Sequence, residues 1–253
     1  DDLVGRLLDK LDRMGLAEDT LVIHTADHGC GNRGKFTLYE GGLRIPFAAC
    51  LPGVIQPRSR LGGLRSNADL LPTLLDMAGG EPPEDAVLDG RSFWPALTGQ
   101  PETDPRDHLY AEFGYSRALI TERWKYSARR PPNRLADEMA SGQRDYALNV
   151  AGHFRLKDPA LYARKYPAYF DTDQLFDLTA DPDEQANCFY HPDCAETAVR
   201  MRAELADICA GFEAPFPLDT VHPYLHSPEH RALCDKTRDA QDLWEVGWYR
   251  RGS

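Results

Sequence analysis

Three residues near the start of the sequence, Asp27, His28 and Lys35, have the chemical types needed to bind a metal ion and an anion. The apolar and β-branched stretch of residues 20–26 ends at Asp27-His28-Gly29. This pattern predicts a buried strand, and open α/β sheets hold their ligands at the carboxyl ends of such strands. Since carboxylate and imidazole groups bind divalent cations, we expect Asp27 and His28 to bind one cation there.

The loop that follows this strand is rich in glycine and carries two positive charges. Residues 29–35 read GCGNRGK, so Arg33 and Lys35 lie close in sequence to the expected metal ligands. Cationic side chains beside a metal site suit an anionic substrate. From the residues alone, Lys35 is either a substrate contact or a surface lysine. Arg33 is either a second substrate contact or a solvated charge.

The elements that must position these residues alternate between helix and strand. Residues 3–14 have the apolar spacing of a helix that ends at Gly15. A second strand is predicted at residues 45–51, and a helix at residues 70–78 with Asp69 as its cap. Helix, strand, loop, strand and helix in this order are typical of an α/β layered sheet with parallel strands.

The pattern changes after about residue 104, where short strand-like runs follow one another. They lie at residues 109–113, 118–121, 124–127 and 174–178 and predict a small antiparallel sheet. The long insertion at 129–173 should contain helices of its own, because a structureless loop of that length is uncommon. A further helix is predicted at 195–212, and the tail beyond Pro215 shows no regular period. We expect two domains, residues 1–105 and 106–253, with the tail available for contact with a second subunit.

Composition narrows the classes of partner and of compartment. The net charge of −11 argues against nucleic acid, which needs a basic surface, and no apolar run reaches membrane-spanning length. The six cysteines form no CxxC pair, so neither a disulfide framework nor a structural zinc site is expected. The absence of an Asn-x-Ser/Thr sequon favours a cytoplasmic or periplasmic protein over a glycosylated secreted one.

Eight segments, taken in order, resemble the C-terminal half of the formylglycine-dependent sulfatases of the alkaline phosphatase superfamily. They are TLVIHTADHG at 20–29, GKFTLYEGG at 34–42, RIPF at 44–47, DLLPTLL at 69–75, DGRS at 89–92, RWKY at 123–126, LFDL at 175–178 and DPDEQAN at 181–187. The resemblance implies part of an α/β layered sheet of the alkaline phosphatase type, followed by a smaller subdomain of antiparallel sheet and helix.

The resemblance also implies chemistry for the residues singled out above. Asp27 and His28 match the Asp-Asn or Asp-His pair that completes the family's divalent metal site, usually calcium. Because His28 would supply nitrogen where calcium prefers oxygen, manganese stays open. Lys35 matches the lysine that contacts the sulfate group and the modified nucleophile. The implied activity is hydrolysis of a sulfate ester or sulfamate on a sulfated small molecule or saccharide.

The family's nucleophile motif, Cys/Ser-x-Pro-x-Arg, is not found in this sequence. Cys50-Leu51-Pro52-Gly53-Val54 has cysteine and proline at the right spacing but valine where arginine is required. We therefore expect the formylglycine upstream of this chain, which would then be a fragment that is inactive alone. The alternatives are a phosphonate or phosphate monoester hydrolase of the same superfamily, which shares the Asp-His pair, and a non-catalytic binding fragment.

Three further residues near the expected site have structural interpretations. Glu40 and Arg44 are expected to form an ion pair that shapes the Lys35 loop. His24 lies three residues before Asp27 on the predicted strand, so its side chain points to the other face. We therefore expect His24 to be a core histidine.

Overall fold

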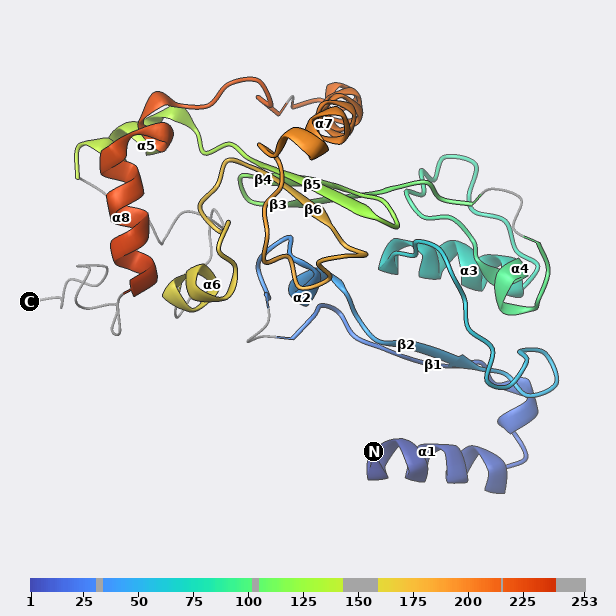
Figure 1. The fold of residues 1–253 in the computed structure, drawn as a ribbon. Coiled ribbons are helices and arrows are strands. Elements are labelled where there is room, and N and C mark those ends of the chain that lie inside the picture. The colour runs from blue at the N-terminus through green and yellow to red at the C-terminus, as the bar shows by residue number, and fades with distance from the viewer. Residues whose placement is uncertain (31–33, 102–104, 143–158, 215, 240–253) are drawn as a thin grey trace, which may run out of the picture. The chain divides into compact units, whose positions relative to one another are not determined.

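The computed structural model describes residues 1–30, 34–101, 105–142, 159–214 and 216–239, and the chain divides into two compact units (Figure 1). The first unit comprises residues 1–27 and 45–109. The second unit comprises residues 28–44 and 110–253, so it contains both His28 and Lys35. Among the described residues, no helix is long and apolar enough to cross a membrane.

The first unit contains helices and one pair of strands. Its elements are α1 (Asp2–Arg13), η1 (Ala17–Asp19), β1 (Val22–Thr25), β2 (Phe47–Cys50), η2 (Asn67–Asp69), α3 (Leu70–Met77) and α4 (Trp94–Leu97). The predicted first helix is confirmed, and it ends as expected. Gly15 takes a left-handed φ of 65°, and the amides of Gly15 and Leu16 donate to the carbonyls of Asp12 and Leu11.

The expectation of parallel strands is wrong for this pair, because β1 and β2 run antiparallel. Val22 pairs with Cys50 and Thr25 pairs with Phe47. Parallel pairing needs a crossover connection that carries the chain back along the sheet, usually through a full helix. Within its described residues, the connection here contains the single turn α2 (Glu40–Leu43) and no longer helix, and a hydrogen bond from the Gly29 amide to the Gly42 carbonyl (2.8 Å) closes its base.

The interpretation of His24 as a core residue is also wrong, since its side chain is exposed. The small core of the first unit consists of Ile55, Phe93 and Leu97, and Leu21, Leu51 and Ala49 of β2 pack against it. His24 pairs with Ala48 in the register and therefore lies on the opposite face of the strand pair. That face has no such cluster among the described residues.

Asp69 does not cap α3 with its side chain, contrary to the sequence interpretation. The short turn η2 precedes the helix. Ser66 caps η2, and its hydroxyl accepts a hydrogen bond from the Ala68 amide. The Asp69 carboxylate turns back to accept from the amides of Ser66 (2.7 Å) and Arg91 (2.9 Å), and it pairs with Arg106. Since Asp69 is only 1% exposed, these donors replace the water it loses on burial.

The second unit is built on a four-stranded sheet with the order β3-β4-β5-β6 (Figure 1). Its strands are β3 (Leu109–Phe113), β4 (Ser116–Ile120), β5 (Trp124–Arg129) and β6 (Asp173–Asp177); its longer helices are α5 (Asn133–Ala140), α6 (Pro159–Lys165), α7 (Ala195–Ala210) and α8 (Pro228–Asp239), with the short turns η4 (Pro192–Cys194) and η5 (Pro223–His226). The predicted strands and the helix α7 are confirmed. β4 and β5 pair antiparallel, as do β5 and β6.

The insertion and the tail are more regular than the sequence pattern alone indicates. Helices α5 and α6 lie in the insertion as expected, although residues 143–158 fall outside the described part of the chain. The tail beyond Pro215 was expected to lack a regular period, yet it contains α8. Its end, residues 240–253, lies outside the described residues, so the expected contact with a second subunit stays a prediction.

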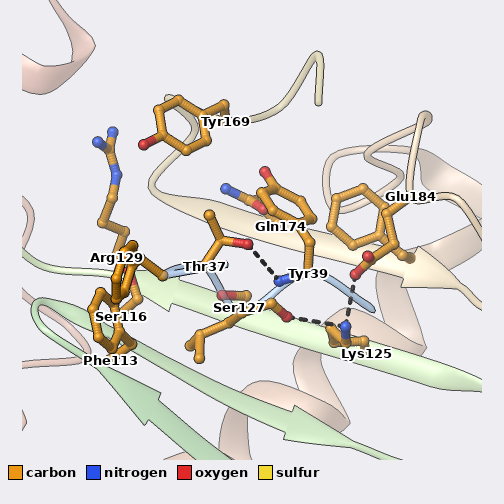
Figure 2. A pocket seen from close by; sticks show the side chains of 13 residues that line it. Thr37, Tyr39, Phe113, Ser116, Lys125, Ser127, Arg129, Tyr169, Gln174 and Glu184 are labelled. Atoms are coloured by element: carbon orange, nitrogen blue, oxygen red, sulfur yellow. Dashed lines mark hydrogen bonds and ion pairs between the residues drawn. The ribbon is translucent and has the colours of Figure 1, made fainter. Parts of the chain in front are cut away.

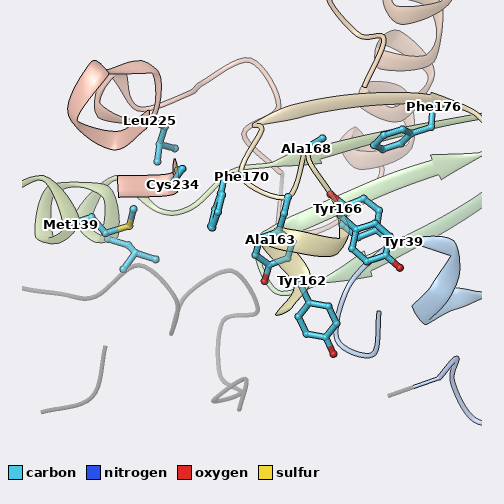
Figure 3. Packing of buried hydrophobic residues seen from close by; sticks show 12 residues of the cluster. Tyr39, Met139, Tyr162, Ala163, Tyr166, Ala168, Phe170, Phe176, Leu225 and Cys234 are labelled. Carbon is cyan, nitrogen blue, oxygen red and sulfur yellow. The ribbon is translucent and has the colours of Figure 1, made fainter. Parts of the chain in front are cut away.

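Alternate side chains of the sheet enter two separate cores. Leu175 and Tyr126 pack with Met201 and Leu205 of α7. Phe176, the next residue along β6, points to the other face and packs in a cluster with Tyr39 and Tyr166 (Figure 3). Tyr39 and Tyr166 stack with their ring centroids 3.8 Å apart. Residues 36–44 are thereby packed onto the face of the sheet opposite α7.

Helix α8 contributes a buried histidine whose protonation should affect stability. His230 is 3% exposed, and burial lowers its pKa to about 4, with Arg129 and His226 acting in the same direction. In the unfolded chain the pKa is near 6.5, so below that pH the unfolded state binds a proton that the folded state does not. The stabilisation is complete above about pH 6.5 and is lost as the pH falls towards 4. We expect His230 to lower the free energy of unfolding by about 2–3 kcal/mol over this fall in pH.

Urea unfolding at about pH 7.5 and about pH 4.5 measures this loss when the parent is compared with His230→Leu. The variant should show a shallower fall in unfolding free energy between the two pH values. His191→Leu is the matched control, because that side chain is 60% exposed. A parallel pH dependence of the parent and His230→Leu would contradict the prediction, since His230 would then titrate alike in both states.

Candidate active-site loop

The loop that carries Lys35 is closed at its base by glycines in close contact. Besides the hydrogen bond between Gly29 and Gly42, a Cβ atom at Gly29 would overlap the Gly41 carbonyl, and one at Gly42 would overlap the Gly34 carbonyl. Only glycine allows the backbones to approach this closely. The glycine-rich sequence therefore fixes the two ends of the loop and leaves Lys35 between them.

Lys35 lies beside the aromatic ring of Phe36, which in turn stacks on a second ring. Its Nζ atom is 5.1 Å from the centroid of the Phe36 ring, and Phe36 stacks on Phe113 at 5.9 Å. Phe36 adopts a left-handed φ of 67°, which is unfavourable for a bulky residue. Thr37 supports this turn, because its hydroxyl donates to the Gly34 carbonyl at 2.6 Å and accepts from the Tyr39 amide at 3.3 Å.

A buried lysine holds the second half of the loop on the sheet (Figure 2). Lys125 of β5 is 1% exposed, and its ammonium group is 2.7 Å from Glu40, 2.8 Å from Glu184 and 3.0 Å from the Leu38 carbonyl. An ammonium group has three hydrogens, so these contacts can use all of them. Two of its partners belong to the loop and one to the turn after β6.

Glu184 completes this cluster of charges and binds the loop backbone as well. One carboxylate oxygen pairs with Lys125, and the other accepts from the Glu40 amide at 2.6 Å. Burial raises the pKa of the Glu184 carboxyl, and Lys125 and the Glu40 amide oppose that rise. Glu184 also holds a left-handed φ of 57°. A backbone conformation this uncommon outside glycine persists because the surrounding contacts fix it.

A cavity of about 30 Å³ lies between the loop and the sheet, and Figure 2 shows the side chains around it. Lys125, Arg129 and Gln174 line it together with the loop residues 36–39. The Tyr39 hydroxyl is buried and has no hydrogen-bond partner among the described residues. The volume is enough for about one or two water molecules, so a bound water can satisfy this hydroxyl.

The two expected metal ligands offer donors of the right chemical type. The His28 Nδ1 atom is 2.7 Å from the Gly29 carbonyl, so that nitrogen carries a proton when it donates there. Metal-binding histidines usually donate one ring nitrogen to such an acceptor and bind the metal through the other. Asp27 provides an exposed carboxylate. Together they supply two donors, fewer than the six to eight oxygen ligands of a typical calcium site.

No group of three or more metal-binding side chains occurs within the described residues. Asp27 and His28 are therefore candidate ligands only, and a complete calcium site would need further donors. Asp27 ends the first segment of the first unit and His28 begins the second unit. Their convergence on one cation stays a prediction, as do the roles of Lys35 and of Arg33, which lies outside the described residues.

One expected contact near the site is wrong, and the sequence interpretation missed two residues. Glu40 pairs with Lys125 rather than with Arg44. Lys125 and Glu184 were not identified as partners, although both belong to segments with a recognisable pattern, RWKY and DPDEQAN. A lysine inside a strand of buried residues is the signal that could have indicated a buried ion pair.

The segment that contains this loop matches a known protein family. A family model described as Sulfatase matches residues 1–80, the part that includes Asp27, His28 and Lys35. An ulvan-active sulfatase of Formosa agariphila is 32% identical over 190 residues, which make up 70% of this chain and 35% of that protein. The chain spans about a third of the length of the curated relatives it matches.

Two solved structures share the fold at 22% sequence identity, a level that shows the fold alone. One is a protein in complex with its substrate D-glucosamine-2-N,6-O-disulfate, with a TM-score of 0.58 over 82% of this chain and 37% of that one. The other is a phosphonate monoester hydrolase of Agrobacterium radiobacter, with a TM-score of 0.56 over 81% and 38%. The family match over residues 1–80 and the 32% identity to the ulvan-active sulfatase place the chain in the sulfatase family of the alkaline phosphatase superfamily.

Proposed function

We propose that this chain supplies the lysine and part of the metal site of an enzyme that hydrolyses sulfate esters or sulfamates. The observation that carries the proposal is the loop Gly29–Gly42, which is closed by glycines at its base and fixed by a buried lysine. It presents Lys35 only a few residues after His28, inside the segment that matches the family model. A fixed cation beside metal ligands suits charge that develops on a transferred sulfate group.

The residues of this chain have separate roles in the proposed reaction. The Lys35 ammonium group would bind a sulfate oxygen and stabilise its negative charge as the S–O bond to the alcohol breaks. Asp27 and His28 would hold a divalent cation, which polarises sulfate oxygens when it is bound. Glu40, Lys125 and Glu184 would keep the loop in place without touching the substrate. The nucleophile, a formylglycine, would come from a segment outside these residues.

The substrate class proposed is a sulfated saccharide or another sulfated small molecule. Similarity to an ulvan-active sulfatase and to a protein bound to a disulfated glucosamine supports a saccharide. A phosphonate monoester hydrolase of similar fold keeps that reaction as the second candidate, because phosphorus and sulfur in the two kinds of ester are both tetrahedral and both carry anionic oxygen. A phosphonate monoester is therefore included in the assay below.

The isolated chain should show no turnover of an aryl sulfate, with or without added calcium or manganese. No residue in it lies in a Cys/Ser-x-Pro-x-Arg motif, and the described residues supply too few metal ligands. The complete enzyme, with a formylglycine-bearing segment, should hydrolyse the aryl sulfate and lose that activity when the metal is chelated.

Turnover is measured as release of the phenol from an aryl sulfate and from an aryl phosphonate monoester. Metal-dependent turnover by the pure chain would refute the need for an outside nucleophile. A complete enzyme that prefers the phosphonate would favour the second candidate, and one that cleaves neither substrate would favour a non-catalytic binding protein.

A further inference from the structure

A second concave site lies on the second unit, between α8 and the segment that leads into β6. It has a volume of about 500 Å³, and we call it the α8 cleft. One wall is the face of α8 that carries His230, Arg231 and Arg238, and the facing residues include Asp171 and Tyr190. The volume lies within the range of small-molecule binding sites in proteins. Cys234, Leu225 and Phe170 also line the cleft, and they belong to the hydrophobic cluster drawn in Figure 3.

The chemistry of the α8 cleft favours binding over catalysis. The Cys234 sulfur lies 3.7 Å from the His230 Nε2 atom, a pair that in other settings forms a nucleophile and its base. Here burial raises the pKa of the thiol to about 12 and lowers the pKa of the imidazole to about 4. Both groups are therefore neutral near pH 7, and the thiol is not activated.

Two polar side chains of the cleft are accessible to solvent and yet lie in a partly dehydrated setting. Asp171 is exposed, but burial by surrounding atoms raises the pKa of its carboxyl, and Asn187, Arg238 and Arg231 oppose that rise. Tyr190 is 70% exposed, and burial likewise raises the pKa of its hydroxyl, which Thr172 hydrogen-bonds. Access combined with partial burial is the property of a groove that a ligand can enter.

The two arginines of the cleft have unused hydrogen-bonding capacity. Arg238 uses its terminal nitrogens on Asp235 (3.0 Å) and the Pro167 carbonyl (3.1 Å), but its Nε is buried with no partner among the described residues. Arg231 is exposed and makes no side-chain hydrogen bond or ion pair within the described residues. The two lie seven positions apart on α8, about 10 Å along the helix, so one ligand can reach both.

We propose that the α8 cleft binds an acidic saccharide, with Arg231 on its anionic group and the Tyr190 ring against a sugar face. A guanidinium group matches the planar fork of a carboxylate and the oxygens of a sulfate. An exposed tyrosine ring provides a flat apolar surface, and the Asp171 carboxylate accepts hydrogen bonds from sugar hydroxyls. The anionic group can thus be a uronic acid carboxylate or a sulfate ester. This site is separate from the proposed active-site loop and is measured as binding without turnover.

The test is a calorimetric and NMR titration of the full chain with three disaccharides at neutral pH. These are an unsulfated chondroitin disaccharide, its sulfated form, and maltose as the neutral sugar. We expect Kd values of about 0.1–1 mM for the acidic sugars and binding at least about tenfold weaker for maltose. Amide shifts should concentrate in residues 225–238. A preference for the sulfated disaccharide would identify sulfate as the recognised group, and equal affinity would identify the carboxylate.

Matched variants assign the binding to the cleft. Arg231→Ala and Tyr190→Ala should each weaken binding of the acidic sugar by about tenfold, and Arg231→Lys should weaken it less. Arg200→Ala removes the same charge from α7, where Arg200 pairs with Glu204, and should leave binding unchanged. Lys35→Ala should also leave it unchanged, which separates this site from the proposed active site. The proposal is overturned by no saturable binding, by equal binding of maltose, or by equal effects of Arg231→Ala and Arg200→Ala.

Discussion

Replacing Lys35 with alanine in the complete enzyme is expected to lower kcat by about 10²–10³-fold, the usual effect of removing one charge-stabilising donor from an active site. The loop geometry explains why kcat rather than KM should fall. Lys35 is fixed between Gly34 and Phe36 on a loop closed at its base, so its ammonium group is positioned before the substrate binds. A preorganised charge stabilises most strongly the state in which negative charge has developed.

The same substitution should have little effect on folding. Among the described residues, the Lys35 ammonium group contacts the Phe36 ring, and loss of that contact should change the free energy of unfolding by no more than about 1 kcal/mol. Lys236→Ala on the exposed side of α8 is the matched control and should change neither kcat nor the melting temperature. Steady-state kinetics on an aryl sulfate and thermal unfolding measure the two effects. Near-normal kcat in Lys35→Ala would show that Lys35 is a surface charge.

The sequence correctly predicted the helices and strands that are specified by the pattern of residues next to one another in the chain. The helix that ends at Gly15 and the helix α7 have regular apolar spacing, and the strands of the second unit have turn residues between them. The orientation of β1 and β2 could not be predicted in the same way. It depends on the contact of Gly29 with Gly42 and Gly41, which forms only after the loop has folded back on itself.

Helix α8 was not predicted from the sequence for a different reason. Its buried residues are His230, Cys234 and Thr237, spaced as on one helical face but not strongly apolar. A search for Leu, Ile and Val at helical spacing therefore does not detect this face. The histidine can be buried because it is neutral there, a property of its tertiary environment rather than of its neighbours in sequence.

In the candidate site, too, residues that are close in sequence could be identified, whereas residues that meet only in the fold could not. Asp27, His28 and Lys35 lie within nine positions of one another, so their types and spacing could be interpreted directly. The residues that hold their loop come from elsewhere, since Lys125 is 59 positions from Glu184 and lies even further along the chain from Glu40. No local pattern specifies such a pairing. The tertiary fold must first bring the turn after β6 beside the loop.

Replacing Lys125 with methionine is expected to destabilise the second unit by about 3–5 kcal/mol, the range for removing one partner of a buried ion pair. Methionine fills nearly the same space, so a cavity contributes little. The loss comes from Glu184, which is 0% exposed and would keep a buried carboxylate without its ammonium partner. The Leu38 carbonyl would lose its donor as well. The urea midpoint should therefore fall, and hydrogen exchange at the Glu40 amide, which donates to Glu184, should accelerate.

Two further variants test whether the unpaired buried charge of Glu184 causes the loss of stability in Lys125→Met. The double variant Lys125→Met/Glu184→Gln should regain part of the lost stability, because it removes the unpaired carboxylate while keeping an acceptor for the Glu40 amide. Arg123→Met breaks the exposed pair with Asp177 in the same part of the sheet and should leave the urea midpoint close to that of the parent. If Lys125→Met were as stable as Arg123→Met, the cluster would not hold the loop. The loss of kcat expected for Lys35→Ala would then need a different structural basis.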